Sequence, residues 1–321
     1  MAKNISIGID LGGTKIMAVV FDKNFDVLAS SRVPTQGHRG SKAGLKRIWS
    51  TIESAMDSAG VSKNEIASCG IGCPGVVDFS EGILKEAANL GWNDVNIGKY
   101  LSRKIGKNVV VLNDVDAGTF GEYHLGAAKG AYSVFGVFPG TGVGGGFVYD
   151  GKILRGKKAS CMEFGRFRML GSTLEGDLHE PVALELLCGR LGIASACSIE
   201  ASRGNAKSIM DTAGTDIKKV KSGVIKKSIE AGEDKILDVM NRSIHYLGIG
   251  VTSVVELLAP EVVVLGGGLV EKMPHLYMDG LKESVQNYGS KALAESVSFK
   301  VAEMGDLAVA AGAAAYALAN K

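Results

Sequence analysis

Three clusters of glycine, each directly after a predicted strand, are the part of this chain best suited to bind phosphate. They occupy positions 12–13, 140–146 and 266–268. Because glycine has no Cβ atom, backbone N–H groups in such turns can approach phosphate oxygens and surround them. One cluster could be an ordinary turn, whereas three in one chain favour a phosphate-binding protein.

Two common phosphate motifs do not account for these clusters. Gly140-x-Gly142-x-x-Gly145 matches the dinucleotide fingerprint by letter, but residues 147–149 continue as a strand where that fingerprint requires a helix. The stretch 8–15 lacks the Gly-Lys-Ser/Thr order of a P-loop. The phosphate site is therefore expected to be of another kind.

Asp10 ends the first predicted strand, beside the turn that contains Gly12, Gly13 and Thr14. Its carboxylate would point to the same place as the turn amides, which suits Mg²⁺ or a water bound to Mg²⁺ next to a phosphate. The alternative is that Asp10 bonds to its own turn. The two further glycine clusters favour the metal-binding interpretation.

Asp114 is the best candidate for a general base. The strand at 109–112 leads into Asn113 and Asp114, directly before a helical stretch. A carboxylate at a strand end can accept a proton from a substrate, but Asp and Asn are also the preferred helix caps, and the spacing favours neither role. Asp116 and Glu122 are interpreted as an acid of the first helical turn and a surface acid.

The elements that would position these residues occur twice. A strand at 5–10, a glycine turn and a strand at 15–21 predict a hairpin, and a shift of 128 residues places 5–22 on 133–150. Four of the eighteen positions are identical, and Phe138 stands where the first copy has its acid. The repeat predicts a duplicated α/β fold with two lobes and one ligand shared by the two glycine turns.

Apolar spacing and chain-breaking residues predict the remaining elements. Helices are expected at 41–60, 97–105, 181–194, 236–258 and from about 306, and strands at 66–72, 109–112, 261–265 and 297–301.

Composition excludes several other classes of protein. The 321 residues include 36 Lys and Arg against 34 Asp and Glu, a formal net charge of +2. Because positive and negative charges nearly balance, the protein has no general attraction for nucleic acid or an anionic membrane. No apolar stretch is long enough to span a bilayer. Five cysteines without a C-x-x-C pair favour reduced thiols, and hence a soluble cytoplasmic protein.

Taken together, these motifs resemble the ROK family of bacterial sugar kinases and sugar-responsive repressors. Residues 8–15 are similar to its first phosphate motif, 140–146 to its second, and 260–268 to its nucleotide-binding segment. The resemblance implies a two-lobed α/β fold of the actin-like ATPase (ribonuclease H-like) type with an interlobe cleft. The smaller lobe would comprise residues 1–113 plus 306–321, and the larger lobe residues 114–305.

The resemblance also implies an activity. ATP and Mg²⁺ would bind between the lobes, and Asp114 would take the proton from a sugar hydroxyl as it attacks the γ-phosphate, a contribution of about 10²- to 10⁴-fold. The residues implied for nucleotide and metal are Asp10, Gly12, Gly13, Thr14, Lys15, Gly140, Thr141, Gly142, Gly266, Gly267 and Gly268. Those implied for the sugar are Asn89, Asn113, Asp114, Glu163, Arg166 and Glu185.

The chain departs from the family at its zinc motif. Arg166 replaces the family's histidine, and the three cysteine positions hold Gly176, Leu178 and Ala183. His179 and Cys188 do not restore four ligands, so we expect no zinc. Arg166 could use its planar guanidinium to grip sugar hydroxyls or a carboxylate, or could simply pair with a nearby acid.

Two alternatives to an ATP-dependent sugar kinase stay open. The altered zinc segment permits a sugar-binding or sensing protein without catalysis, and some family members use polyphosphate as donor. A DNA-bound repressor is disfavoured because Ile5 already begins the first strand. Homodimers are usual in the family, so a homodimer is expected.

Overall fold

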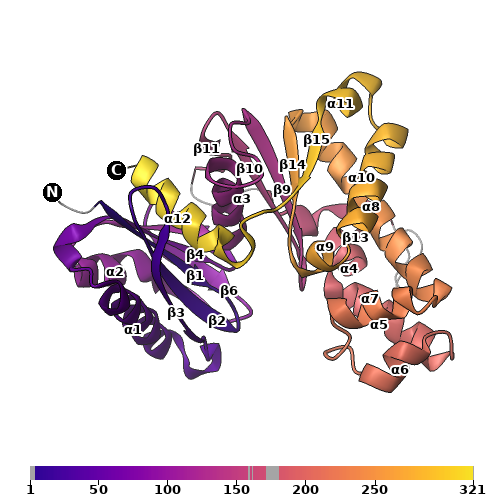
Figure 1. Cartoon of the computed structure of the whole chain (residues 1–321), viewed down its shortest axis with the longest axis horizontal. Coiled ribbons are helices and arrows are strands. Elements are labelled where there is room, and N and C mark those ends of the chain that lie inside the picture. Colours follow the sequence, from indigo (N-terminus) through magenta and orange to yellow (C-terminus); the bar gives the residue numbers. More distant parts are fainter. Residues whose placement is uncertain (1–3, 158–159, 161, 171–180, 321) are drawn as a thin grey trace. The chain divides into compact units, whose positions relative to one another are not determined.

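The structure, a computed structural model, describes residues 4–157, 160, 162–170 and 181–320 (Figure 1). Contacts within the chain divide it into two compact units. Unit 1 comprises Met1–Val134, Gly146–Met162 and Glu303–Lys321, and unit 2 comprises Phe135–Gly145 and Glu163–Ala302. Among the described residues, no helix is both long and apolar enough to cross a membrane.

Unit 1 contains a five-stranded sheet in the order β3-β2-β1-β4-β8. Its strands are β1 (Ile5–Leu11), β2 (Lys15–Phe21), β3 (Val27–Pro34), β4 (Ile66–Cys73) and β8 (Val109–Asn113). The first three are antiparallel neighbours, which confirms the predicted hairpin, whereas β1, β4 and β8 run parallel. Parallel pairing brings the carboxyl ends of β1, β4 and β8 to one edge.

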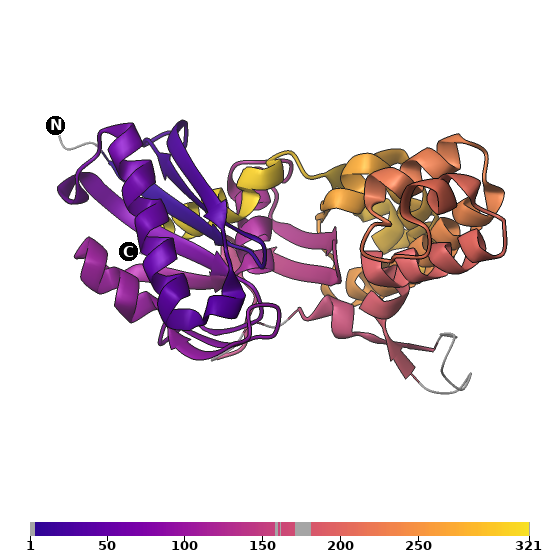
Figure 2. The ribbon, with the colours of Figure 1, turned by 90° about the horizontal axis from the view of Figure 1, so that it is seen from below.

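Helices cover both faces of this sheet. On one face, α1 (Ser41–Ala59) and α2 (Ile97–Ile105) pack against alternate residues of β1 such as Ile7 and Ile9. On the other face lies α12 (Ala308–Ala319), and Figures 1 and 2 show the indigo α1 and the yellow α12 on opposite sides. Successive residues of a strand point to opposite faces of the sheet, so the residue between Ile7 and Ile9 faces α12.

The glycine and alanine excess allows α12 to lie directly on the sheet. A Cβ atom at Gly8 would collide with the carbonyl of Ala310, and one at Gly70 with that of Ala313. Helix α3 (Asp114–His124) makes a similar close approach, because a Cβ at Gly121 would collide with the carbonyl of Ala308. These small residues therefore serve packing between backbones rather than ligand binding.

The division into units differs from the lobes expected from the sequence. Unit 1 continues to Val134, past the expected boundary at residue 113, because α3 packs along α12. A second antiparallel sheet in unit 1 contains β5 (Val76–Asp78), β6 (Ile83–Ala87) and β7 (Trp92–Asn96).

The second five-stranded sheet has the order β11-β10-β9-β14-β15. Its strands are β9 (Ser133–Pro139), β10 (Val143–Tyr149), β11 (Lys152–Ile153), β14 (Val262–Leu265) and β15 (Ser298–Val301). The helices of unit 2 are α4 (Leu184–Cys188), α5 (Arg190–Ser202), α6 (Lys207–Ala213), α7 (Ser222–Glu230), α8 (Asp234–Leu258), α9 (Gly268–Lys272), α10 (Pro274–Tyr288) and α11 (Lys291–Ser296).

The single helix predicted at 181–194 is wrong. Residues Pro181–Ala183 form strand β13, which pairs with β12 (Arg168–Leu170), and Gly189 then separates α4 from α5. Gly189 is extended because it packs against the second glycine cluster, where its Cβ would lie 3.0 Å from the Thr141 carbonyl oxygen. A tertiary contact thus overrides the local helical pattern.

Candidate functional site

Two predicted acids lie at the same edge of the unit 1 sheet. In the parallel register, Asp10 of β1 is the partner of Gly72 on β4, and Gly72 is the partner of Leu112 on β8. Asp114 follows two residues after Leu112, so it lies beyond the same carboxyl edge as Asp10. The topology therefore brings together two carboxylates that are 104 residues apart in the sequence.

The helix-capping role belongs to Asn113 and not to Asp114. The Asn113 side-chain oxygen accepts hydrogen bonds from the backbone N–H groups of Val115 at 2.8 Å and Asp116 at 3.2 Å, and its amide donates to the Gly75 carbonyl at 3.0 Å. Asp114 is the first residue of α3, where its carboxylate also accepts the Val115 N–H at 3.0 Å. Because Asn113 satisfies the cap, the Asp114 carboxylate is available for another role.

The environment raises the pKa values of both carboxyl groups. Burial and, to a lesser extent, the charge of Asp10 raise the pKa of Asp114 to about 7, although the Val115 N–H opposes the shift. Burial also raises the pKa of Asp10 to about 6, opposed by Lys15 and Arg32 and assisted by Asp306. A carboxyl group that titrates near neutrality is suited to exchange protons with a substrate at physiological pH.

Cys73 lies at the same sheet edge as the two acids, and sequence reasoning did not include it among the site residues. It ends β4 between the two acids, is fully buried, and has a thiol whose pKa is raised by burial and by the charges of Asp114 and Asp10. Its position at a strand end between two strands that carry acids was the available signal. The neutral thiol adds no charge and keeps the two carboxylates in an apolar surrounding.

The first glycine turn is closed by the backbone and anchored by β3. Gly12 N–H donates to the Lys15 carbonyl at 2.9 Å. Thr35, which directly follows β3, donates its hydroxyl to the Gly12 carbonyl at 2.7 Å and its N–H to the Thr14 carbonyl at 3.0 Å. Sequence reasoning missed Thr35, whose only signal in the sequence is a threonine shortly after a largely polar stretch at 29–32.

Asn89, predicted to bind sugar, lies beside this turn. It belongs to the loop between β6 and β7, and a Cβ atom at Gly13 would be 3.1 Å from its side-chain nitrogen. The turn itself is exposed at Gly13 and Thr14. Unit 1 therefore gathers Asp10, Asn113, Asp114, the Gly12–Lys15 turn and Asn89.

The third glycine cluster and residues 140–145 of the second lie side by side in unit 2. The Arg190 N–H at the start of α5 donates to the Gly140 carbonyl at 2.9 Å. Gly267 has φ of 87°, and a Cβ there would lie 2.8 Å from the carbonyl oxygen of Pro139, the residue before Gly140. Only glycine adopts that backbone and fits that contact easily.

Glu185, Glu163 and Arg166 lie around the second cluster. A Cβ at Gly142 would collide with the Glu185 carboxylate, and Gly165 lies against the Glu185 side chain. Arg166 Nε lies 3.3 Å from Glu163 Oε2, and the two side chains are 69% and 48% exposed. Pairing with a nearby acid is therefore the contact that Arg166 makes, and so exposed a pair contributes little to stability.

Other sequence expectations have mixed outcomes. Glu122, predicted at the surface, is fully buried, so that prediction was wrong, whereas Asp116 does lie in the first turn of α3. Of the positions considered for zinc, Gly176, Leu178 and His179 lie outside the described residues. Cys188 is buried and its thiol donates to the Ser243 carbonyl at 3.1 Å.

The surroundings of Asp10 fit a divalent cation. Within the described part of the chain, Lys15 and Arg32 form their ion pairs with Asp306 rather than with Asp10. The half-buried Asp10 carboxylate therefore keeps oxygen ligands for an ion beside the glycine turn. Carboxylate and water oxygens are the ligands that Mg²⁺ prefers.

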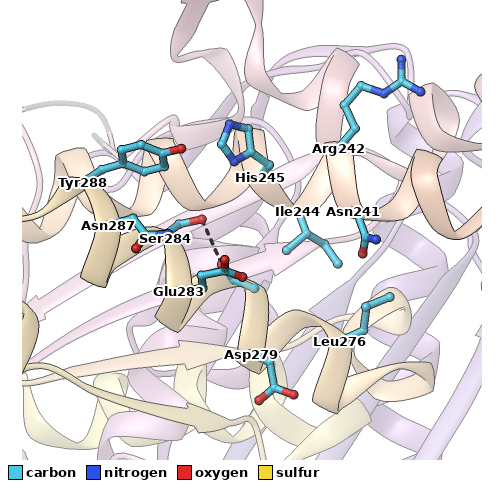
Figure 3. A pocket seen from close by; sticks show the side chains of 11 residues that line it. Asn241, Arg242, Ile244, His245, Leu276, Asp279, Glu283, Ser284, Asn287 and Tyr288 are labelled. Carbon is cyan, nitrogen blue, oxygen red and sulfur yellow. Dashed lines mark hydrogen bonds between the residues drawn. The ribbon is translucent and has the colours of Figure 1, made fainter.

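A pocket of about 580 Å³ lies elsewhere in unit 2, between α8 and α10 (Figure 3). Arg242 and His245 of α8 and Asp279, Glu283 and Tyr288 of α10 are among its lining residues. The residues predicted from the sequence to bind ligand are not among those that line it.

Comparisons with known proteins agree on one family. The model of the ROK family matches residues 6–320. A glucokinase of Halalkalibacterium halodurans is 27% identical over 94% of this chain and 91% of its own. An N-acetyl-D-glucosamine kinase of Haemophilus influenzae is 28% identical over 96% of this chain and 97% of its own. The crystal structure of a ROK family glucokinase from Streptomyces griseus, in complex with glucose and AMPPNP, is 25% identical, with a TM-score of 0.81 over 98% of this chain and 99% of that one.

Proposed function

The chain belongs to the ROK family and has its actin-like ATPase fold, and from this premise we propose that it is an ATP-dependent sugar kinase. The enzyme transfers the γ-phosphate of ATP to a hydroxyl group of a hexose or a related sugar. The observation that carries the proposal is the position of the Asp114 carboxyl group, at the start of α3 and beyond the carboxyl ends of β1, β4 and β8. It lies at the strand edge that also carries Asp10 and adjoins the first glycine turn.

Asp114 is the general base in this proposal. Its carboxylate accepts the proton of the attacking sugar hydroxyl as the oxygen approaches the γ-phosphorus. Asn113 caps α3 and so holds the backbone of Asp114, while burial and the charge of Asp10 make the carboxylate basic enough for this step at neutral pH. A well-placed base contributes about 10²- to 10⁴-fold to such a reaction.

The remaining residues bind and orient the two substrates. Backbone N–H groups of the turns at 12–14 and 140–142 hold the phosphates, and the turn at 266–268 contacts the nucleoside part. Asp10 holds Mg²⁺ directly or through water, and this ion neutralises phosphate charge when bound. The side chains that hold the sugar hydroxyls are those of Asn89, Glu163, Arg166 and Glu185, together with the one amide N–H of Asn113 that its bond to Gly75 leaves.

The relatives include a glucokinase and an N-acetyl-D-glucosamine kinase, which supports an aldohexose for this chain. Arg166 stands where the family resemblance leads us to expect a histidine. If the Arg166 guanidinium exchanges its ion pair with Glu163 for a contact with the substrate, it favours a sugar that has a carboxylate or a further hydroxyl oxygen to accept its N–H groups.

The test is a coupled assay of ADP release with ATP and Mg²⁺ over aldohexoses, ketohexoses, N-acetylated amino sugars and sugar acids. We expect sugar-dependent ADP release that Asp114→Ala abolishes. Asp94→Asn is the control, because it removes an exposed carboxylate from an ion pair with Lys85 in the same unit. Sugar binding measured by calorimetry, without turnover, would contradict the proposed kinase activity and favour a sugar sensor. Activity with polyphosphate but not with ATP would contradict the proposal that ATP is the donor.

A further inference from the structure

A group of three charged side chains in unit 1 is only partly explained by the proposed function. Asp306, just before α12, bridges two cations: its Oδ1 is 2.8 Å from Lys15 Nζ and its Oδ2 is 2.8 Å from Arg32 Nη2. Lys15 directly follows the first glycine turn. Arg32 on β3 and Asp306 have so far no part in the function.

The strand register places these cations on the face of the sheet that carries Asp10. Asp10 is the partner of Met17 on β2, and Met17 is the partner of Arg32 on β3. Direct partners on antiparallel strands point to the same face, and Lys15, two residues before Met17, points there as well. This is the face that α12 covers, since Met17 packs with Ala310 and Ala311 of that helix.

The positions of all three residues are determined by the surrounding fold. Strand β3, which carries Arg32, continues into Thr35, which anchors the glycine turn through two hydrogen bonds. The segment before Asp306 is held by the buried Glu122 carboxylate, which accepts the N–H groups of Glu303 at 3.1 Å and Met304 at 2.8 Å. The same helix α3 that begins with Asp114 thus positions Asp306.

These ion pairs are too open to serve mainly the stability of the fold. The side chains of Lys15, Arg32 and Asp306 are 31%, 51% and 62% exposed, and ion pairs this exposed contribute little to stability. Two cations share the Asp306 carboxylate, and Asp10 is a second acid within electrostatic range of both. Lysine has three N–H donors and arginine five, so both keep donors for a further anion.

We propose that Arg32 and Lys15 together bind a phosphate group of the phosphoryl donor, and that Asp306 is a positioning residue that holds both cations beside the first glycine turn. The inference rests on the proposed kinase function and adds Arg32 and Asp306 to its donor site. Arg32 supplies a planar donor group that suits phosphate oxygens. Asp306 acts through the two cations and does not itself touch the donor.

The experiment compares Arg32→Gln, Arg32→Lys, Asp306→Asn and Asp306→Glu with the unaltered protein. It measures KM for ATP, KM for the sugar, kcat, and the Kd of ATP and of inorganic tripolyphosphate by calorimetry. We expect Arg32→Gln to raise KM and Kd for both phosphate compounds about tenfold, with less loss for Arg32→Lys. KM for the sugar should stay unchanged. Asp306→Asn should weaken donor binding about threefold to tenfold, and Asp306→Glu should restore most of it.

The outcomes separate this inference from the proposed function. An unaltered protein that turns over sugar and ATP, together with an Arg32→Gln variant of unchanged donor KM, would overturn the inference alone. Tighter donor binding by Asp306→Asn would show that Asp306 competes with the donor, and would overturn its positioning role. An unaltered protein that binds neither ATP nor tripolyphosphate would overturn both proposals. Asp94→Asn controls for the loss of an exposed ion pair, and thermal unfolding midpoints control for folding.

Discussion

Replacement of Asp114 by Asn should produce two effects of opposite sign. The substitution preserves the size of the side chain and leaves Asn113 as the helix cap, so α3 should begin where it does now. The amide cannot accept the proton of the sugar hydroxyl. We therefore expect kcat to fall about 10²- to 10⁴-fold, with KM for ATP nearly unchanged because the phosphate turns are intact.

The same substitution should stabilise the folded protein at alkaline pH. The folded-state pKa of Asp114 is raised to about 7 from 3.8, so ionisation of this group opposes folding increasingly as pH rises from 3.8 to 7. Each pKa unit is worth about 1.4 kcal/mol, which sets an upper limit of about 4 kcal/mol above pH 7. Asn does not ionise, so the variant escapes this cost.

The assays are steady-state kinetics at pH 8 and urea unfolding at pH 5 and pH 8. The unfolding free energy of Asp114→Asn, relative to the unaltered protein, should be larger at pH 8 than at pH 5. A variant with lost turnover and unchanged or lower stability at pH 8 would mean that Asp114 is not in the environment described. Turnover equal to that of the unaltered protein would refute its role as base.

Three further predictions concern pH, packing and a buried acid. The value of kcat/KM should decline as pH falls below about 7, because protonation of Asp114 removes the base, and a flat profile from pH 5 to 8 would contradict this. Gly121→Ala should lower the free energy of unfolding by about 1–3 kcal/mol, since its Cβ meets the Ala308 carbonyl. Gly118→Ala on the same helix should be neutral or stabilising by up to about 1 kcal/mol, because its Cβ would meet only Val309 at 3.7 Å; equal effects in urea unfolding would refute the packing argument. Glu122→Gln should lower the free energy of unfolding by about 1–3 kcal/mol, because Oε2 accepts the Glu303 N–H and Oε1 the Met304 N–H, and an amide keeps only one of these two acceptors. An unfolding free energy at pH 8 that the change does not affect would count against this prediction.

The two hairpins could be predicted because their signals are local. Alternating apolar residues on either side of a glycine turn indicate two strands wherever they occur, and β1, β2, β9 and β10 lie where the pattern places them. The long apolar face of α8 is equally local, and its helix covers the predicted 236–258. The residues of the first glycine turn could be predicted for the same reason.

The helix expected at 181–194 shows where local reasoning ends. Its apolar spacing is helical, but Pro181–Ala183 pair with a strand and Gly189 packs against Thr141. Neither contact can be predicted from the sequence of residues 181–194 alone. The burial of Glu122 is of the same kind, because its partners Glu303 and Met304 are 181 and 182 residues away.

By itself the sequence determined which residue types are available for phosphate, metal and proton chemistry, since glycine turns and strand-end acids depend on local backbone preference. Only the tertiary structure showed that Asn113 caps α3 and that Asp114 lies beyond the same sheet edge as Asp10, because the register of β1, β4 and β8 brings these residues together. It also revealed the Lys15–Asp306–Arg32 group. Electrostatic interactions and burial depend on which residues are neighbours in space. Only folding brings together residues that are far apart in the sequence.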